Sequence, residues 1–240
     1  SATVRRYAAD PSVQVHGPGR SKILFGDDQV DRWRDHLDVM VESVLANGGR
    51  SCINCSGIWV SRHGRAIAEA MAERLSKVEP RPLADPQAEL AAFTDPQVAK
   101  AIADEIEAGC REPGVTDVTA PHCKTRLVVK ERSAFLLPTV VHCERPDRKL
   151  ANVEYLFPFV AVVECPQAAM LEAIGPTLVC TAITEDRRFS RDLLDTTSID
   201  RLNLGPLPTT AVDWRQPHEG NLVEFLFRHR AVQVAQAGSG

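Results

Sequence analysis

The run Asn47-Gly48-Gly49-Arg50-Ser51-Cys52 places a cysteine directly after a glycine-rich turn. A thiol at such a turn can lie among free backbone N–H groups, which favour the thiolate over the thiol. A thiolate is the nucleophile in covalent chemistry on carbonyl groups, and the same N–H groups can bind the oxyanion that forms on attack. The alternative is that Cys52 is a small buried residue in the core.

The cysteines of this chain do not form a regular framework. They stand at positions 52, 55, 110, 123, 143, 165 and 180. Their odd number and irregular spacing differ from the dense patterns of secreted disulfide proteins, so we expect reduced thiols in a cytoplasmic protein. Cys52 and Cys55 form one C-x-x-C pair. A zinc site needs a second ligand pair at suitable spacing, so no metal site is predicted.

The composition is typical of a globular protein. The chain has 240 residues, of which 44% are hydrophobic and 25% are charged, enough to bury a substantial core. A net charge of -4 and only 5% aromatic residues argue against a nucleic-acid surface. No apolar run approaches the length of a membrane span and no signal peptide is evident. We therefore expect neither nucleic acid nor membrane as a partner.

The candidate nucleophile lies between an amphipathic helix and a buried strand. Apolar residues recur at helical spacing over residues 29–46, which predicts a helix there. Asn47, Gly48 and Gly49 form a left-handed stop at its end, a conformation that Gly and Asn adopt at low cost. The apolar run 57–60 is predicted to be a buried strand, and a second helix is predicted over 63–78.

Strands and helices continue to alternate along the chain. Further strands are predicted at 13–15, 22–25, 126–129, 134–143, 159–164, 177–184 and 199–204, and further helices at 97–108, 168–174 and 186–194. This alternation indicates an α/β layer architecture. The nearly uninterrupted apolar run 177–184 is typical of a sheet covered on both faces. No glycine-rich nucleotide-binding loop follows a strand, so no complete nucleotide-binding half is expected in the chain.

Several motifs occur in the order that one enzyme family shows. The run Asn47-Gly48-Gly49-Arg50-Ser51-Cys52 resembles the N-x-G-Q-x-C turn around the nucleophile of the aldehyde dehydrogenase superfamily. Further similar segments are Gly19-Arg20-Ser21 (the family's G-G-K-S), 26–31 (D-A-D-L-D), 137–140 (P-T-V), 154–159 (E-x-F-G-P-V), 203–205 (I-N) and 217–220 (P-F-G-G). Their common order and spacing make the resemblance specific, and it covers residues 12–230.

The resemblance implies the fold and the domain organisation. Members of the family are much longer, and their amino-terminal half is a Rossmann-type nicotinamide-binding domain. The expected fold is therefore α/β: the three-layer αβα catalytic domain of aldehyde dehydrogenase type, with a mostly parallel sheet, lacking most of the Rossmann-type cofactor domain. Residues 1–20 are expected to be a residual edge of the cofactor domain, 21–230 the catalytic thiol domain, and 231–240 a tail.

The resemblance also implies a site. Cys52 corresponds to the nucleophile that forms a thiohemiacetal with an aldehyde and then, after hydride loss to NAD or NADP, an acyl thioester. Glu154 matches the glutamate that binds the nicotinamide ribose hydroxyls, and a carboxylate can accept two hydrogen bonds from a diol. The alternative for Glu154 is a solvated acid at a strand end. Leu156 stands where the family has a phenylalanine against the nicotinamide.

Two departures from the family pattern concern the chemistry directly. His16, or Gln14 if the gap shifts, stands where hydrolytic members have the glutamate that activates the deacylating water. A histidine can act as a general base near neutral pH, but His16 can equally be a packed or surface residue. Arg50 replaces the family's glutamine, and its charge either favours the Cys52 thiolate or faces solvent. A third departure lies in residues 217–221.

Several functions therefore stay open. The first is a nicotinamide-dependent aldehyde dehydrogenase, acting on a small-molecule aldehyde. Family members that pass the acyl group to coenzyme A, or that reduce acyl-CoA, also lack the water-activating glutamate, so coenzyme A is a possible further cofactor and an acyl thioester a possible substrate. Two more hypotheses are a non-catalytic relative with the same fold and a thiol-redox protein that uses Cys52 and Cys55. Family members are usually oligomers, which predicts a homo-oligomer.

Overall fold

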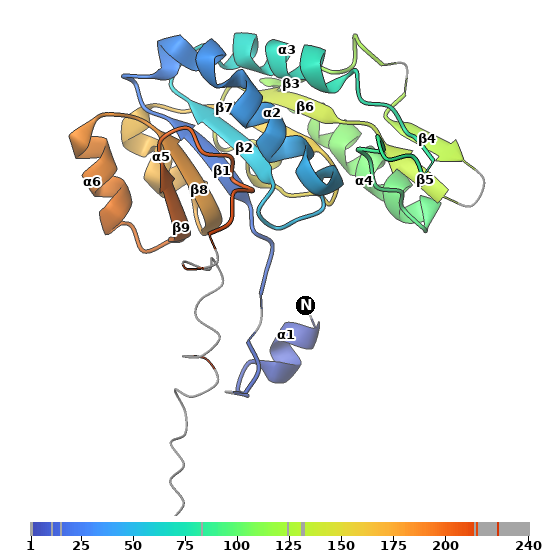
Figure 1. Cartoon of the computed structure of the whole chain (residues 1–240), viewed down its shortest axis with the longest axis horizontal. Coiled ribbons are helices and arrows are strands. Elements are labelled where there is room, and N and C mark those ends of the chain that lie inside the picture. Colours follow the sequence, from blue (N-terminus) through green and yellow to red (C-terminus); the bar gives the residue numbers. More distant parts are fainter. Residues whose placement is uncertain are drawn as a thin grey trace, which may run out of the picture. The chain divides into compact units, whose positions relative to one another are not determined.

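The computed structural model describes residues 2–10, 12–14, 16–82, 84–123, 125–130, 133–213, 215 and 225. The chain divides into two compact units, Gly19–Ala211 on the one hand and Ser1–Pro18 with Val212–Gly240 on the other. Helix α1 (Ala2–Tyr7) belongs to the second unit. The sheet and the helices that pack on it all belong to the unit Gly19–Ala211. Figure 1 labels these strands and helices.

A seven-stranded sheet forms the centre of this unit, in the order β3-β6-β7-β2-β1-β8-β9. The strands are β1 (Ser21–Phe25), β2 (Cys55–Val60), β3 (Val115–Asp117), β6 (Thr139–Cys143), β7 (Phe159–Glu164), β8 (Thr177–Ile183) and β9 (Ile199–Leu204). All neighbours are parallel except β3, which pairs antiparallel with β6. A separate antiparallel pair consists of β4 (Leu127–Lys130) and β5 (Ser133–Leu136).

Helices cover both faces of the sheet. One buried cluster joins alternate residues of β1 and β2 to α2 (Leu37–Leu45) and α3 (Gly64–Leu75). The other cluster joins the opposite faces of the same strands to α4 (Pro96–Gly109), α5 (Gln167–Ile174) and α6 (Arg187–Asp195). In Figure 1, α2 and α3 run along one side of the sheet. Because both faces are covered, strands such as β1 and β2 are buried along their whole length.

The predicted three-layer α/β architecture with a mostly parallel sheet is confirmed. The predicted helix over 29–46 instead begins as a 3₁₀ segment, η1 (Val30–His36), with a kink at Arg32, and continues as α2. In η1 the buried residues Val30 and Trp33 stand three apart, which is the 3₁₀ period. A further 3₁₀ turn, η2 (Ala46–Gly49), follows α2.

Two strand predictions need correction, and one strand was missed. The predicted strand 134–143 is two strands, β5 and β6, separated at Leu137 and Pro138, because proline cannot donate to a sheet ladder. The short strand β3 was not predicted. In the predicted strand 13–15, Val13 and Gln14 are not in a strand, and Val15 lies outside the described residues. A third 3₁₀ turn, η3 (Lys149–Asn152), precedes β7.

None of the helices in the described part of the chain has the length and apolar character that crossing a membrane requires.

Candidate active site

The candidate site lies at the amino-terminal edge of the sheet. Strands β7, β2 and β1 are neighbours and run parallel, so the loops that enter them meet at one edge. Gly19 and Arg20 precede β1, Cys52 precedes β2, and Glu154 precedes β7. The sheet therefore brings the loops of Cys52 and Glu154, which are about a hundred residues apart in the sequence, to the same edge.

Main-chain contacts with the start of β1 hold Cys52 in place. Its side chain is partly exposed, and its carbonyl oxygen accepts a hydrogen bond from the Ser21 hydroxyl at 2.9 Å. Gly19 approaches the same carbonyl so closely that a Cβ atom at position 19 would stand 1.9 Å from the oxygen. Only glycine fits at position 19, which fixes the distance between this turn and the Cys52 peptide.

The turn that leads to Cys52 has the predicted left-handed conformation. The φ angles of Asn47, Gly48 and Gly49 are 54°, 63° and 68°. A Cβ atom on Gly49 would lie 2.3 Å from the main-chain nitrogen of Pro158. The glycine therefore serves two purposes, because it allows the positive φ and lets the turn pack on the backbone of the segment that carries Glu154.

Glu154 binds the turn before β1. Its carboxylate accepts a hydrogen bond from the Arg20 N–H, and burial raises the pKa of Glu154 above its ordinary value although the main-chain hydrogen bond opposes this shift. Arg20 has a φ of 45°, which is unusual for a residue other than glycine or asparagine. The same turn thus contacts both predicted site residues, Cys52 through Ser21 and Glu154 through Arg20.

Lys22 binds the carbonyl of Arg20, whose N–H binds Glu154. Its ammonium donates to the Arg20 carbonyl at 2.6 Å, and the residue is only 1% exposed. Burial lowers the pKa of Lys22 to about 8, against an attraction to the Glu154 charge that favours the protonated form. Neither Ser21 nor Lys22 was identified as part of the site from the sequence. A lysine inside the apolar run 21–25 was the available signal, because lysine is almost never fully buried without a partner.

Arg50 is exposed, as one of the two predicted alternatives has it, and it also makes contacts that were not predicted. Its guanidinium donates to the Ala92 carbonyl at 2.7 Å and lies 4.7 Å from the centre of the Phe93 ring. The side chain therefore joins the turn before Cys52 to the connection between α3 and α4.

Cys55 is a core residue. Its thiol is buried and donates to the Gly57 carbonyl at 3.3 Å, and burial raises the pKa of Cys55 to about 12. All seven cysteines are free thiols. These observations favour packing for Cys55 and disfavour a Cys52–Cys55 redox pair, which would need a reactive partner thiol.

The remaining predicted residues are less closely connected to the site. Leu156 follows Glu154 in the same segment and is 52% exposed. His16 and Gln14 are exposed and belong to the compact unit formed by Ser1–Pro18 and Val212–Gly240, so their roles stay predictions. The loop 217–221 and the tail 231–240 lie outside the described residues.

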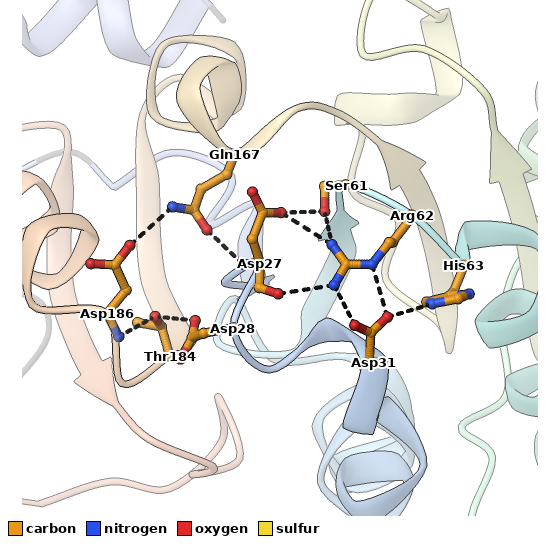
Figure 2. A network of polar contacts seen from close by, with 9 residues as sticks. All are labelled: Asp27, Asp28, Asp31, Ser61, Arg62, His63, Gln167, Thr184 and Asp186. Carbon is orange, nitrogen blue, oxygen red and sulfur yellow. Dashed lines mark hydrogen bonds and ion pairs between the residues drawn. The ribbon is translucent and has the colours of Figure 1, made fainter.

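A second polar cluster occupies the opposite, carboxyl-terminal edge of the sheet (Figure 2). Arg62 donates to the carboxylate of Asp31 and to the main-chain carbonyl of Asp27, and hydrogen bonds from Arg62 and His63 hold the pKa of Asp31 below its ordinary value. Asp28 accepts from the Thr184 hydroxyl at 2.8 Å, which ties the ends of β1 and β8 together. The D-A-D-L-D-like segment 26–31 thus links the loops at the edge away from Cys52.

Comparisons with known proteins agree with this fold. A sequence model described as the aldehyde dehydrogenase family matches residues 5–174, whereas no curated protein sequence matches the chain. Similar solved structures are PnpE from Pseudomonas sp. WBC-3 (16% identity, TM-score 0.71, 88% of this chain and 44% of that one), a putative aldehyde dehydrogenase from Burkholderia cenocepacia (18%, 0.69, 90% and 45%) and an NAD⁺ complex of an aldehyde dehydrogenase from Bacillus cereus (15%, 0.65, 85% and 41%).

These comparisons define what the chain shares with its relatives. At such low identities, the structural likeness shows the fold, and the chain spans less than half the length of each of these three structures. The family match is independent of them and covers more than half of the chain. The chain belongs to the aldehyde dehydrogenase family.

Proposed function

We propose that this chain is the catalytic domain of a nicotinamide-dependent aldehyde dehydrogenase and that Cys52 is its nucleophile. The observation that carries the proposal is the arrangement of one turn, Gly19–Ser21, which contacts the Cys52 carbonyl on one side and the Glu154 carboxylate on the other. This arrangement places a partly exposed thiol and a half-buried carboxylate at one edge of the sheet.

In this mechanism the Cys52 thiolate attacks the carbonyl carbon of an aldehyde. A carbon–sulfur bond forms while the carbonyl electron pair moves onto oxygen, which gives a tetrahedral oxyanion attached to Cys52. Main-chain N–H groups of the turn are the candidate donors to that oxygen. The close contacts of Gly19 and Gly49 fix the turn before the reaction, so little reorganisation is needed when charge develops.

Glu154 and Leu156 are the residues that would hold the nicotinamide end of the cofactor. Each carboxylate oxygen has two lone pairs, so the bond from Arg20 leaves Glu154 able to accept hydrogen bonds from ribose hydroxyls. Leu156 is exposed and apolar beside it, as a residue that packs on a ring would be. Bound NAD or NADP would supply the hydride acceptor through which the Cys52 adduct becomes an acyl thioester.

The acyl acceptor follows from the residue that replaces the family's water-activating glutamate. With His16 as the general base, the acceptor is water and the product is a carboxylic acid. Without a base the thioester lasts until a thiol such as that of coenzyme A attacks it. Analysis of the product as free acid or acyl-CoA in the presence of both acceptors separates these two reactions.

Selective alkylation of Cys52 tests the proposal. The folded chain is treated with a small excess of iodoacetamide at pH 6, and the modified cysteines are identified by peptide mass spectrometry. We expect Cys52 to react at least about 10-fold faster than each of the other six cysteines, since an activated nucleophile is more ionised than a buried thiol. The Cys52→Ser variant should lose this fast phase.

One result would contradict the proposal, and another would contradict an expectation drawn from it. If Cys52 reacts no faster than the other cysteines, the chain is better described as a non-catalytic relative. We also expect these 240 residues alone to turn over no aldehyde, because the relatives are more than twice as long. Dehydrogenase activity of this chain by itself would contradict this expectation, because it would show that these 240 residues hold the whole cofactor site.

A further inference from the structure

Asn54 connects the end of α2 to the turn that carries Cys52. Its side chain is 6% exposed, and its amide nitrogen donates to three main-chain carbonyls. These carbonyls belong to Ser43, Val44 and Ala46, at 3.1, 3.4 and 2.9 Å. The last carbonyls of a helix have no partner within the helix, so Asn54 supplies the hydrogen bonds that α2 itself cannot make.

The other end of the same carboxamide closes the Cys52 turn. The Asn54 side-chain oxygen accepts a hydrogen bond from the Ser51 N–H at 2.8 Å, and the Asn54 N–H donates to the Ser51 carbonyl at 2.9 Å. Cys52 lies between these two residues and is therefore enclosed in a turn fastened by both main chain and side chain. Ser21 holds the Cys52 carbonyl from the opposite side.

An asparagine is the side chain that suits this position. It offers two N–H donors and one carbonyl acceptor, and the structure uses both kinds of group. Aspartate has the same shape but no donor when ionised, and alanine would leave buried carbonyls of α2 and the Ser51 N–H without this partner. The chain has no other side chain hydrogen-bonded to both the end of α2 and the Cys52 turn among the contacts described for residues 16–82.

We propose that Asn54 is a positioning residue for the Cys52 nucleophile, fixing the orientation of the Cys52 peptide by locking its turn to the end of α2. This inference rests on the proposed function of Cys52. Asn54 does not need to touch the substrate in this role. Its effect is to keep the turn in one conformation, so that the thiol and the neighbouring N–H groups keep the geometry in which the thiolate is favoured.

The test is the pH dependence of Cys52 alkylation in the full chain. Rate constants for iodoacetamide are measured by peptide mass spectrometry from pH 5 to pH 9 for wild type, Asn54→Ala and Asn54→Asp. We expect both variants to move the midpoint of the Cys52 profile upward by about one pH unit, which makes the rate at pH 6 about 10-fold lower. Loss of stability alone does not move this midpoint while the variants remain folded.

The matched control is Asn203→Ala. Asn203 is also 6% exposed, and its amide donates to the Thr181 hydroxyl at 3.1 Å in the strand pair β8–β9. This variant loses a buried asparagine hydrogen bond but should keep the wild-type alkylation profile. A shift as large as that of Asn54→Ala would mean that general loosening explains the effect, which would overturn the inference.

The outcomes separate this inference from the proposed function. A slow wild-type Cys52 contradicts the proposed function. A fast wild-type Cys52 whose rate and midpoint are unchanged in the folded Asn54 variants contradicts only the role of Asn54. If neither variant folds, the hydrogen-exchange rate of the Ser51 amide in wild type tests the role of Asn54 instead. We expect exchange at least about 100-fold slower than in an unstructured peptide, and exchange at the unstructured rate would overturn the inference.

Discussion

Lys22 shows how a single buried charge can organise a site without touching the reacting atoms. The residue holds the Arg20 carbonyl, while Glu154 holds the Arg20 N–H. Opposite charges on Lys22 and Glu154 thus stabilise from both sides a residue whose φ of 45° is unfavourable by itself. We attribute to this pair the conformation of the turn that contacts Cys52.

The buried position of Lys22 predicts a specific pH dependence of stability. Its pKa is about 8 in the folded chain, against an ordinary value of 10.5. Between these values the unfolded chain binds one more proton, so the free energy of unfolding rises with pH. Urea unfolding should show that wild type gains up to about 3 kcal/mol relative to Lys22→Met between pH 8 and pH 10.5.

Lys77→Met is the control for this experiment, because Lys77 is exposed. Its stability difference from wild type should be the same at both pH values. Parallel pH curves for wild type and Lys22→Met would show that the pKa of Lys22 is the same in the folded and the unfolded chain.

At the scale of secondary-structure elements, helix α2, the left-handed turn and strand β2 together position Cys52. The helix ends where Asn47 begins the left-handed turn, and the turn packs on the backbone of residues 157–158. Arg50 adds a contact with the segment that precedes α4. The position of Cys52 thus depends on two segments that are distant in the sequence.

Replacement of Gly49 tests how much this packing contributes. Gly49→Ala should lower the free energy of unfolding by at least about 3 kcal/mol, because alanine is strained at a φ of 68° and its Cβ would collide with the Pro158 nitrogen. Gly205→Ala is the control, with a φ of 95° and no atom within 4 Å of the added Cβ. Its cost should be only the backbone strain of about 1–2 kcal/mol. Equal costs in chemical denaturation would mean that the turn adapts to the added methyl group.

At the scale of the whole molecule, the two edges of the sheet carry different groups of residues. At the carboxyl-terminal edge, where ligands of open α/β sheets usually bind, Asp31 pairs with Arg62 and Asp28 with Thr184. The amino-terminal edge carries Cys52 and Glu154. The loops entering β1, β2 and β7 therefore carry the residues of the proposed site.

The unit Gly19–Ala211 should fold by itself. Both faces of its sheet are covered by its own helices, and its carboxyl-terminal segment is fastened to α2 by the bond from the Thr209 N–H to the Ser43 hydroxyl at 3.0 Å. We expect a chain of residues 19–211 to show one cooperative transition in urea, followed by circular dichroism.

A shorter chain of residues 19–176 is the control for this prediction. It lacks β8, which is the neighbour of β1 inside the sheet, and should not unfold cooperatively. A non-cooperative transition of the 19–211 chain would mean that the other unit is required for folding.

Local patterns in the sequence determined most of the elements and the candidate nucleophile. The left-handed stop at residues 47–49 was predictable because few residues adopt that conformation cheaply, and the three-layer fold followed from alternating strands and helices. Cys52 and Glu154 were also found from the sequence, because each lies in a short motif that can be read without knowing the fold.

Only the tertiary structure decided how these residues are connected. That Ser21 and Lys22 serve the site depends on the order in which β7, β2 and β1 assemble, and no local pattern encodes that order. The partners of Arg50 likewise depend on packing against a distant segment. Hydrogen bonds and close contacts act between neighbours in space, whereas propensities act between neighbours in sequence.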